Sequence, residues 1–357
     1  MVLKRMRSDG LIVTAAVVTI LLAVILLAAG PIYADAVTVA GAQRRLADAD
    51  VTEANVAINH RVSGEEYPAS DDLVTAEAQR LLAPIGGEIL RTGRSEPYKL
   101  PDESLELIAE SIDEDDRRTR QTVFEFRESI ESHAALVDGR WPEPAENQVE
   151  VVLPEGAATV LGLTVGDEFA LANRLAPNLV LDAQVVGIYR ANNPDDGFWY
   201  GETLPVDGVD FGESVVLIGP LVTDRATFES MVMVRITAVE WRLEPAFKDL
   251  QLGDVPPLRG SLGALPVRLD RGAEVGTPYQ IASDLGPLLA EIDRGLLAAR
   301  SGVFILTLQL AILAGYALVL TANLLTDVRS VEMALLRSRG AGVRQVVGFS
   351  LLEGLVL

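Results

Sequence analysis

Residues 301–326 read SGVFILTLQLAILAGYALVLTANLLT, and no residue in this stretch carries a charge. A helix of this length rises further than the roughly 30 Å hydrocarbon core of a bilayer. A core helix of a water-soluble domain seldom stays uncharged for so long. The sequence therefore predicts a transmembrane helix over 301–326. The basic residues that follow indicate a cytoplasmic side, so this helix runs from outside to inside; they are Arg329, Arg337, Arg339 and Arg344.

A second uncharged stretch lies near the N-terminus, where residues 11–29 read LIVTAAVVTILLAVILLAA. In a helix it would rise roughly 28 Å, enough to cross the hydrocarbon core. Three basic residues precede it, Lys4, Arg5 and Arg7, and the same flank contains one acidic residue, Asp9. This flank predicts a cytoplasmic segment 1–10 and a transmembrane helix 11–33 running outwards. A cleaved signal peptide ending at Ala34-Asp35-Ala36 is the alternative, but its apolar core is usually shorter, so we favour a retained anchor.

A third apolar segment, VVGFSLLEGLVL, covers 346–357 and is too short to span a bilayer. We interpret 345–357 as the truncated start of a third transmembrane helix, and the chain as a fragment of a longer polytopic protein. An amphipathic tail on the membrane surface is the alternative. Glu353 would lie inside this helix, where an ionisable group usually contacts other protein, so we predict an intramembrane helix contact there.

The segment 34–300 between the two spans holds most of the charge. The chain of 357 residues has a net charge of −21. Residues 1–33 contribute +2 and residues 301–357 contribute +1, which leaves −24 for the middle. Such an acidic segment fits an extracytoplasmic domain that is large enough to bury its own core, and it argues against binding to nucleic acid. The absence of cysteine excludes disulfides and thiolate metal sites.

The pattern of the middle segment predicts mixed α and β structure. Helices are expected over 42–57, 70–83, 102–120 and 279–300, and a Gly/Pro-rich linker over 253–278. Strands are expected within a β-rich core, 121–243, over 121–127, 149–153, 168–171, 179–189, 214–218 and 231–243. Helix 42–57 follows directly on the first span, and helix 279–300 runs directly into the second. These two helices either pair as a stalk or simply pack on the domain.

Several local patterns have a functional and a structural interpretation. The acidic run 113–116 lacks the spacing of a calcium loop and is better explained as a solvated helix face. The aromatic cluster 198–200 could bind a partner, but we favour a place in the core. Only His60 and His133 could serve a serine triad; neither lies near a nucleophile-elbow motif, and we expect both to be surface residues. We predict no catalytic residue, no metal site and no enzyme activity in this chain.

The stretch 327–357, DVRSVEMALLRSRGAGVRQVVGFSLLEGLVL, strongly resembles the cytoplasmic loop and third-helix entry of the FtsX-like (MacB-type) ABC transporter permease family. The matching positions form an ATPase-coupling loop within 327–344 and one helix position beyond it: Arg329, Glu332, Leu335, Leu336, Arg337, Arg339, Gly340, Ala341, Arg344 and Glu353. A weaker resemblance to the family's periplasmic core domain covers 138–190, with DGRWP, VEVVLPEGAATVLGLTVGDEFAL and VVGI. Together these stretches cover about a quarter of the chain, and 34–120 matches nothing.

The resemblance implies an α+β membrane protein: an N-terminal transmembrane helix, a large mixed α/β extracytoplasmic domain of the MacB periplasmic core type, then permease helices. It also implies a multi-pass protein of the bacterial inner or plasma membrane that forms homo- or heterodimers and couples a cytoplasmic ABC-type ATPase to the external domain. Such coupling serves export, lipoprotein release or mechanotransmission, with an unknown extracytoplasmic substrate or partner protein. ATP and Mg²⁺ would bind the partner ATPase, since no lysine here follows a glycine.

Two alternatives to coupling remain. The basic segment 327–344 could be a juxtamembrane helix held by anionic lipid. The whole chain could be a membrane-anchored extracytoplasmic sensor or binding protein without an ATPase partner. A sensor would carry a cytoplasmic output domain after residue 326, where this sequence offers a short basic loop and another apolar segment, so we favour the permease.

Overall fold

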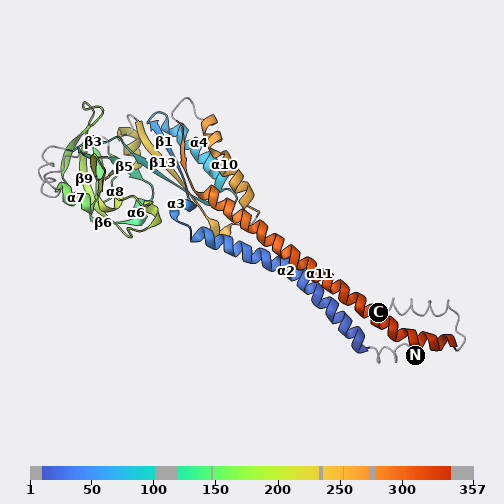
Figure 1. Ribbon diagram of the computed structural model, residues 1–357. Helices are drawn as coiled ribbons and strands as arrows, with labels where there is room; N and C mark the ends of the chain where they lie inside the picture. Colours follow the sequence, from blue (N-terminus) through green and yellow to red (C-terminus); the bar gives the residue numbers. More distant parts are fainter. Residues whose placement is uncertain are drawn as a thin grey trace. The chain divides into compact units, whose positions relative to one another are not determined.

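The computed structural model describes residues 10–100, 119–145, 148–232, 236–251, 253–272 and 278–338 (Figure 1). The chain divides into two units. One is the compact unit Ala42–Asp293, and the other joins Met1–Gly41 with Arg294–Leu357. The predicted helix 102–120 and the acidic run 113–116 lie outside the described residues, apart from 119 and 120, which begin a strand.

The compact unit contains one 14-stranded sheet. Its first seven strands in chain order are β1 (Val56–Ser63), β2 (Gly87–Arg94), β3 (Tyr98–Lys99), β4 (Thr119–Thr122), β5 (Phe124–Arg127), β6 (Ala134–Gly139) and β7 (Val149–Pro154). The other seven are β8 (Glu168–Asn173), β9 (Val180–Ala191), β10 (Val209–Phe211), β11 (Val215–Ile218), β12 (Leu221–Val222), β13 (Ile236–Pro245) and β14 (Gln280–Ala282). Mixed α and β structure with a large sheet is therefore confirmed.

Nine α-helices and three shorter turns of other helix types are present in the described residues. The α-helices are α2 (Gly10–Ala47), α3 (Val51–Ala54), α4 (Tyr67–Leu82), α6 (Ile130–His133), α7 (Glu155–Leu161), α8 (Leu204–Asp207), α9 (Arg225–Thr227), α10 (Val255–Gly272) and α11 (Leu285–Ser338). The turns are the 3₁₀ elements η1 (Gly197–Trp199) and η3 (Phe247–Asp249) and the π-helical η2 (Phe228–Val232).

The sheet runs in the order β10-β11-β4-β3-β8-β9-β7-β12-β5-β2-β13-β1-β14, and β6 pairs with β9 beside this path. Long antiparallel ladders join β13 to both β1 and β2, with Trp241 opposite Ile58 on one side and opposite Arg91 on the other. These pairs join residues more than 140 positions apart in the chain. The sheet therefore depends on contacts that local sequence cannot specify.

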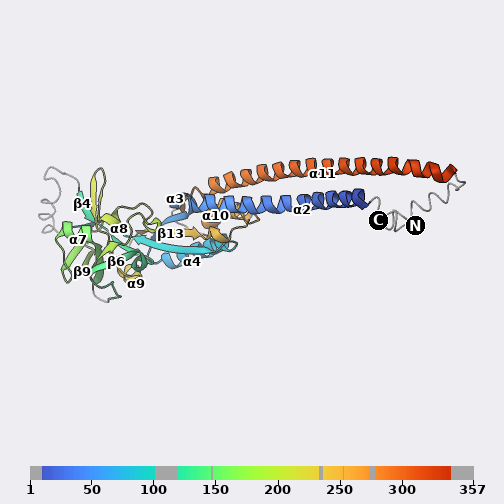
Figure 2. The same ribbon diagram turned by 90° about the horizontal axis from the view of Figure 1, so that it is seen from below.

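Helices α4 and α10 lie side by side next to the β1–β13 part of the sheet (Figures 1 and 2). α4 buries Val74, Ala78 and Leu81, which recur at steps of four and three. α10 buries four leucines that also recur at steps of four and three: Leu258, Leu262, Leu265 and Leu269. Two apolar stripes thus hold a helical layer on this part of the sheet.

A second apolar cluster fills the part of the compact unit around β7, β9 and η1. Trp199 and Tyr189 are its largest fully buried side chains, and Phe198 and Val152 pack with them. The indole Nε1 of Trp199 donates to the carbonyl of Asn193 at 3.0 Å, so its polar edge is satisfied despite burial. Phe198 and Trp199 therefore belong to the core, as predicted for the 198–200 cluster, and not to an exposed patch.

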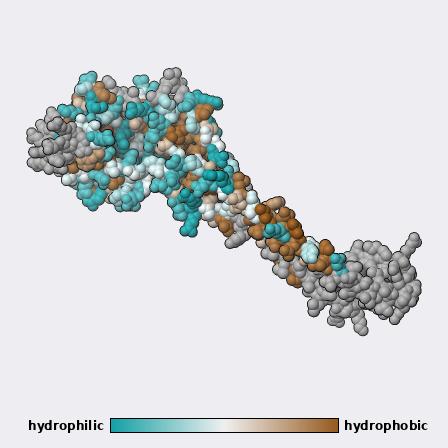
Figure 3. Space-filling view, viewed as in Figure 1, coloured by the Kyte–Doolittle hydropathy of each residue, from teal (hydrophilic) through white to brown (hydrophobic). Residues whose placement is uncertain are grey.

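The other unit contains parts of two long helices. α2 and α11 run side by side in both views (Figures 1 and 2), and a Cβ built on Gly30 would lie 4.0 Å from Thr307 Oγ1. Hydrophobic side chains gather over this segment (Figure 3), and many of them are exposed: Val18, Leu21, Ile32, Phe304, Ile312 and Leu313. Among the described residues, one helical stretch, Leu285–Ala317, is long and apolar enough to cross a membrane, and its most apolar window is not buried.

Three predictions of local structure are wrong. The segment 253–278 is not a linker, since Val255–Gly272 forms α10 with Pro266 inside it. The predicted helix 42–57 is interrupted after Ala47: Val51–Ala54 form the separate helix α3, and the last two residues enter β1 because they pair with β13. The predicted strand 231–243 begins only at Ile236, since 228–232 form η2.

The remaining strand predictions and the helix over 70–83 are confirmed within a few residues. The first predicted strand, 121–127, is divided between β4 and β5. The predicted helix 279–300 begins at Leu285, after the short strand β14.

Candidate functional site

Five residues of the predicted coupling loop lie on α11, whose backbone is helical up to Ser338: Arg329, Glu332, Leu335, Leu336 and Arg337. The other five predicted positions lie outside the described residues: Arg339, Gly340, Ala341, Arg344 and Glu353. The predicted coupling loop is therefore helical as far as Ser338, and it continues the preceding helix without a break at Asp327. Within a helix, positions 328, 331, 335 and 338 fall along one face.

The first two turns of α11 are fixed in the core of the compact unit. Leu285 and Leu289 are fully buried, and Leu288 and Ile292 nearly so. The amide of Leu285 donates to Ser283 Oγ at 3.2 Å, and the Ser283 hydroxyl donates to the carbonyl of Asn55 at 3.0 Å. The predicted apolar stripe of 279–300 is thus confirmed as far as Ile292, whereas Leu297 is exposed.

The last turns of α2 are fixed in the same unit. Leu46 is 2% exposed and Ala42 is also buried. Gln43 Nε2 donates to the carbonyls of Lys248 and Leu250, both at 3.1 Å. The stalk and the packing interpretations of these helices are therefore compatible: residues 42–47 and 285–292 pack on the domain, and the apolar parts of the same helices pair with each other in the other unit.

A buried ionic cluster links β2 and β5 to the segment that follows η1. Glu125 is fully buried and accepts hydrogen bonds from Arg94 Nη2 at 2.6 Å and from Arg127 Nε at 2.8 Å. Glu202 accepts from the same two arginines, at 3.1 Å from Arg94 Nη2 and also from Arg127 Nη2. The side chain of Arg127 is 2% exposed, so the cluster holds charge inside the protein.

The charges of this cluster stabilise each other. Burial by itself would raise the pKa of Glu125, but the guanidinium groups of Arg127 and Arg94 outweigh burial and hold that pKa below its ordinary value. Burial and the negative charge of Glu125 together raise the pKa of Tyr189 well above its ordinary value, and the neutral Tyr189 hydroxyl donates to the carbonyl of Pro205 at 2.9 Å. The cluster thus fixes the 202–205 segment against the sheet.

A second ionic network ties α4 to the sheet through Asp71. Its Oδ1 accepts from Arg91 Nε at 2.6 Å and from Trp241 Nε1 at 2.7 Å, and Oδ2 accepts from Arg225 Nη2 at 3.3 Å. Burial would raise the pKa of Asp71, but the hydrogen bonds from Arg91 and Trp241 and the charge of Arg225 lower it overall. Neither network is predictable from the sequence, because the residues of each network lie far apart in the chain.

Asp71→Asn is expected to make the free energy of unfolding depend less on pH in the acidic range. Because the pKa of Asp71 is lower in the folded state, the carboxylate stabilises the fold above its unfolded pKa of about 3.9, and this advantage disappears as the pH falls through the folded pKa. Urea unfolding followed by tryptophan fluorescence should show a difference between the wild type and Asp71→Asn at pH 7 that shrinks below pH ~4. A difference that stays constant down to the most acidic pH would contradict this assignment.

The two histidines differ in environment. His60 is 9% exposed, and its ring stacks on Tyr279 with centroids 4.1 Å apart, so its prediction as a surface residue is wrong. Burial lowers the pKa of His60. His133 is partly exposed, stacks on Phe198 and has Nδ1 3.2 Å from Asp196 Oδ2. Each histidine therefore has a structural role in packing.

No group of three or more histidine, aspartate and glutamate side chains is placed to hold a metal ion in the described part of the chain. The structure thus offers two helices fixed in one domain and two buried ionic networks. No protein-family model matches the chain, and no curated protein matches it in sequence.

Proposed function

We propose that this chain is the permease subunit of an ABC transporter in a bacterial cell membrane, of the FtsX-like type. In this proposal α2 and α11 cross the membrane, and Ala42–Asp293 is the extracytoplasmic domain, of the MacB periplasmic core type. A cytoplasmic ABC-type ATPase binds ATP and Mg²⁺ and contacts the end of α11. The motion it generates acts on the external domain for export, lipoprotein release or mechanotransmission.

The observation that carries this proposal is the continuity of α11. The helix starts among buried leucines of the compact unit and extends without interruption over Leu285–Ser338, through the uncharged stretch and into the basic segment. At 1.5 Å per residue it is about 80 Å long, well beyond the thickness of a bilayer. One continuous helix therefore connects the proposed cytoplasmic contact with the domain outside the membrane.

The anchoring of α2 supports the same proposal. Its last turns are held by Gln43 and Leu46, so each of the two helices has its own attachment to the domain. A single anchor would suffice to keep a binding domain at the membrane. Two separately fixed helices can also transmit a relative movement, as a mechanotransmitting permease requires.

Single-cysteine labelling tests the membrane arrangement, because the chain has no native cysteine. Ser132→Cys places a thiol on the exposed surface of the compact unit, and Ser338→Cys places one at the end of α11. We use cells in which the reagent can reach the outer face of the cytoplasmic membrane. There a membrane-impermeant maleimide should label Ser132→Cys directly, and it should label Ser338→Cys only after that membrane is permeabilised. Direct labelling of both thiols would overturn the proposal that α11 spans the membrane.

A further inference from the structure

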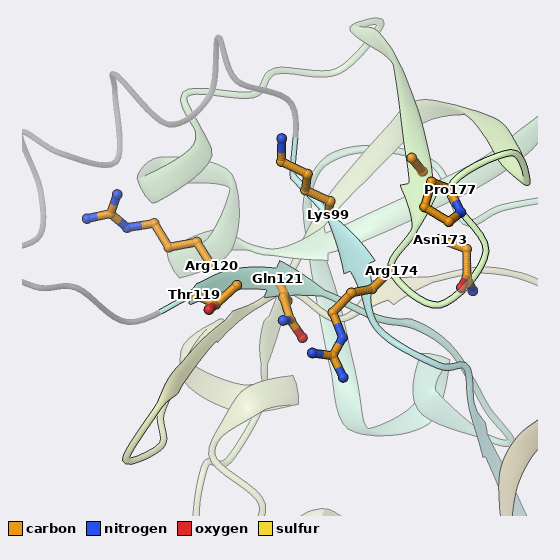
Figure 4. Close-up of a pocket in the computed structure, with 8 residues that line it drawn as sticks. Lys99, Thr119, Arg120, Gln121, Asn173, Arg174 and Pro177 are labelled. Carbon is orange, nitrogen blue, oxygen red and sulfur yellow. The ribbon is translucent and has the colours of Figure 1, made fainter.

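A pocket of about 400 Å³ opens at the β8–β3–β4 part of the sheet (Figure 4). Eight residues line it: Lys99, Thr119, Arg120, Gln121, Ala172, Asn173, Arg174 and Pro177. Among these described residues three are cationic and none is acidic, although acidic residues outnumber basic ones in the chain by 51 to 30. The described lining of the pocket is therefore basic in an acidic protein.

The strand register explains why these side chains gather at one place. Lys99 on β3 lies directly opposite Gln121 on β4 and opposite Ala172 on β8, so these three side chains share one face of the sheet. Arg174 lies two residues beyond Ala172, and its amide extends the ladder by donating to the carbonyl of Pro97 at 3.1 Å. The small side chain of Ala172 leaves a hollow between longer ones.

Two buried donors at this pocket lack partners among the described residues. Gln121 is 2% exposed, and its amide nitrogen Nε2 makes no hydrogen bond. Arg120 Nε is likewise buried and without a partner. Figure 4 shows the Gln121 amide and the Arg174 guanidinium pointing the same way, while Lys99 and Arg120 extend to other sides of the opening. Asn173 Oδ1, by contrast, is satisfied by the amides of Leu175 and Ala176.

We propose that this pocket binds a small organic anion that carries a carboxylate or phosphate group. Arg174 supplies the opposite charge, Gln121 donates its unpartnered amide, and Ala172 and Pro177 contact the apolar part of the ligand. A volume of about 400 Å³ lies within the usual range for small-molecule sites. An unpartnered buried donor destabilises the fold, and a ligand acceptor would remove that cost. The proposal does not depend on the permease function.

Calorimetric titration of the full chain in detergent tests the site, with citrate and inorganic phosphate as separate probes at low ionic strength. We expect saturable binding of at least one probe, and the probe that binds identifies the acidic group recognised. Arg174→Gln should weaken that binding about tenfold or more, because a charge-assisted hydrogen bond is lost. Ala172→Leu should weaken it similarly by filling the hollow without changing any charge.

Arg190→Gln is the matched control for charge. Arg190 lies on β9 of the same sheet, pairs with Glu155 and has a side chain that is 65% exposed, so its replacement should leave affinity unchanged. Gln121→Leu should weaken binding and raise the unfolding midpoint of the ligand-free protein, since the unpartnered donor is gone. The proposal is overturned if neither probe binds saturably, if Arg174→Gln and Arg190→Gln have equal effects, or if Gln121→Leu binds like the wild type.

Discussion

Glu125→Gln is expected to lower the free energy of unfolding of the compact unit by about 3 kcal/mol or more. The substitution removes the charge that faces Arg127 Nε at 2.8 Å and Arg94 Nη2 at 2.6 Å. Of the two carboxylates that contact Arg127, whose side chain is 2% exposed, only Glu202 would then remain charged. A buried charge that loses a partner destabilises far more than an exposed one.

Urea unfolding measured by tryptophan fluorescence checks this prediction, because all three tryptophans lie in Ala42–Asp293: Trp141, Trp199 and Trp241. Glu155→Gln is the control. It breaks a pair of the same chemistry, in which Glu155 and Arg190 are 43% and 65% exposed, and should cost less than about 1 kcal/mol. Equal losses of unfolding free energy in both variants would show that the buried Glu125 cluster contributes no more to stability than an exposed ion pair.

Leu336→Asp is expected to uncouple the ATPase in the proposed transporter. Leu336 lies on the helical part of α11 beyond the uncharged stretch, where the proposal places the contact with the ATPase. A carboxylate forced into an apolar contact must lose its hydration, which should reduce stimulation of ATP hydrolysis by tenfold or more. The unfolding midpoint reported by the tryptophans should not change, since the substitution lies outside the compact unit.

The measurement is ATP hydrolysis by an ABC-type ATPase that co-purifies with the wild type, compared with each variant. Ser330→Asp is the matched control, because it adds the same charge to the same helix six residues earlier, on a different face. Normal ATPase binding and stimulation in Leu336→Asp would contradict the coupling role, as would equal losses in both variants.

The strands were predictable where their pattern is local. Residues 149–153 and 179–189 are rich in β-branched side chains and lie between turn residues, and they form β7 and β9. β1 was missed because its identity depends on pairing with β13, about 180 residues later in the chain. Local preference cannot report a partner at that distance.

α10 was missed for a different reason. Its glycines and prolines suggested a linker, but Pro256 and Pro257 fall in the first turn, where an amide needs no partner in the helix. The stripe Leu258, Leu262, Leu265 and Leu269 was the stronger signal. At the candidate sites, the proposed coupling positions rest on a local motif, whereas the cluster of Glu125 and the pocket at Gln121 exist only after folding joins distant strands.

The single sheet narrows to two-residue strands at β3 and at β12, and β12 has the shorter pairing. This two-residue strand pairs with β7 at one position, Val222 with Val152, and with β5 at two. In the strand order, β12 lies between the ladder that carries the root of α11 and the ladder that carries the pocket, and the backbone also joins these ladders, because Val123 alone separates β4 from β5. Glu202 and the arginines of β2 and β5 lie beside this junction, so their ion pairs act as a brace that resists separation of the two ladders.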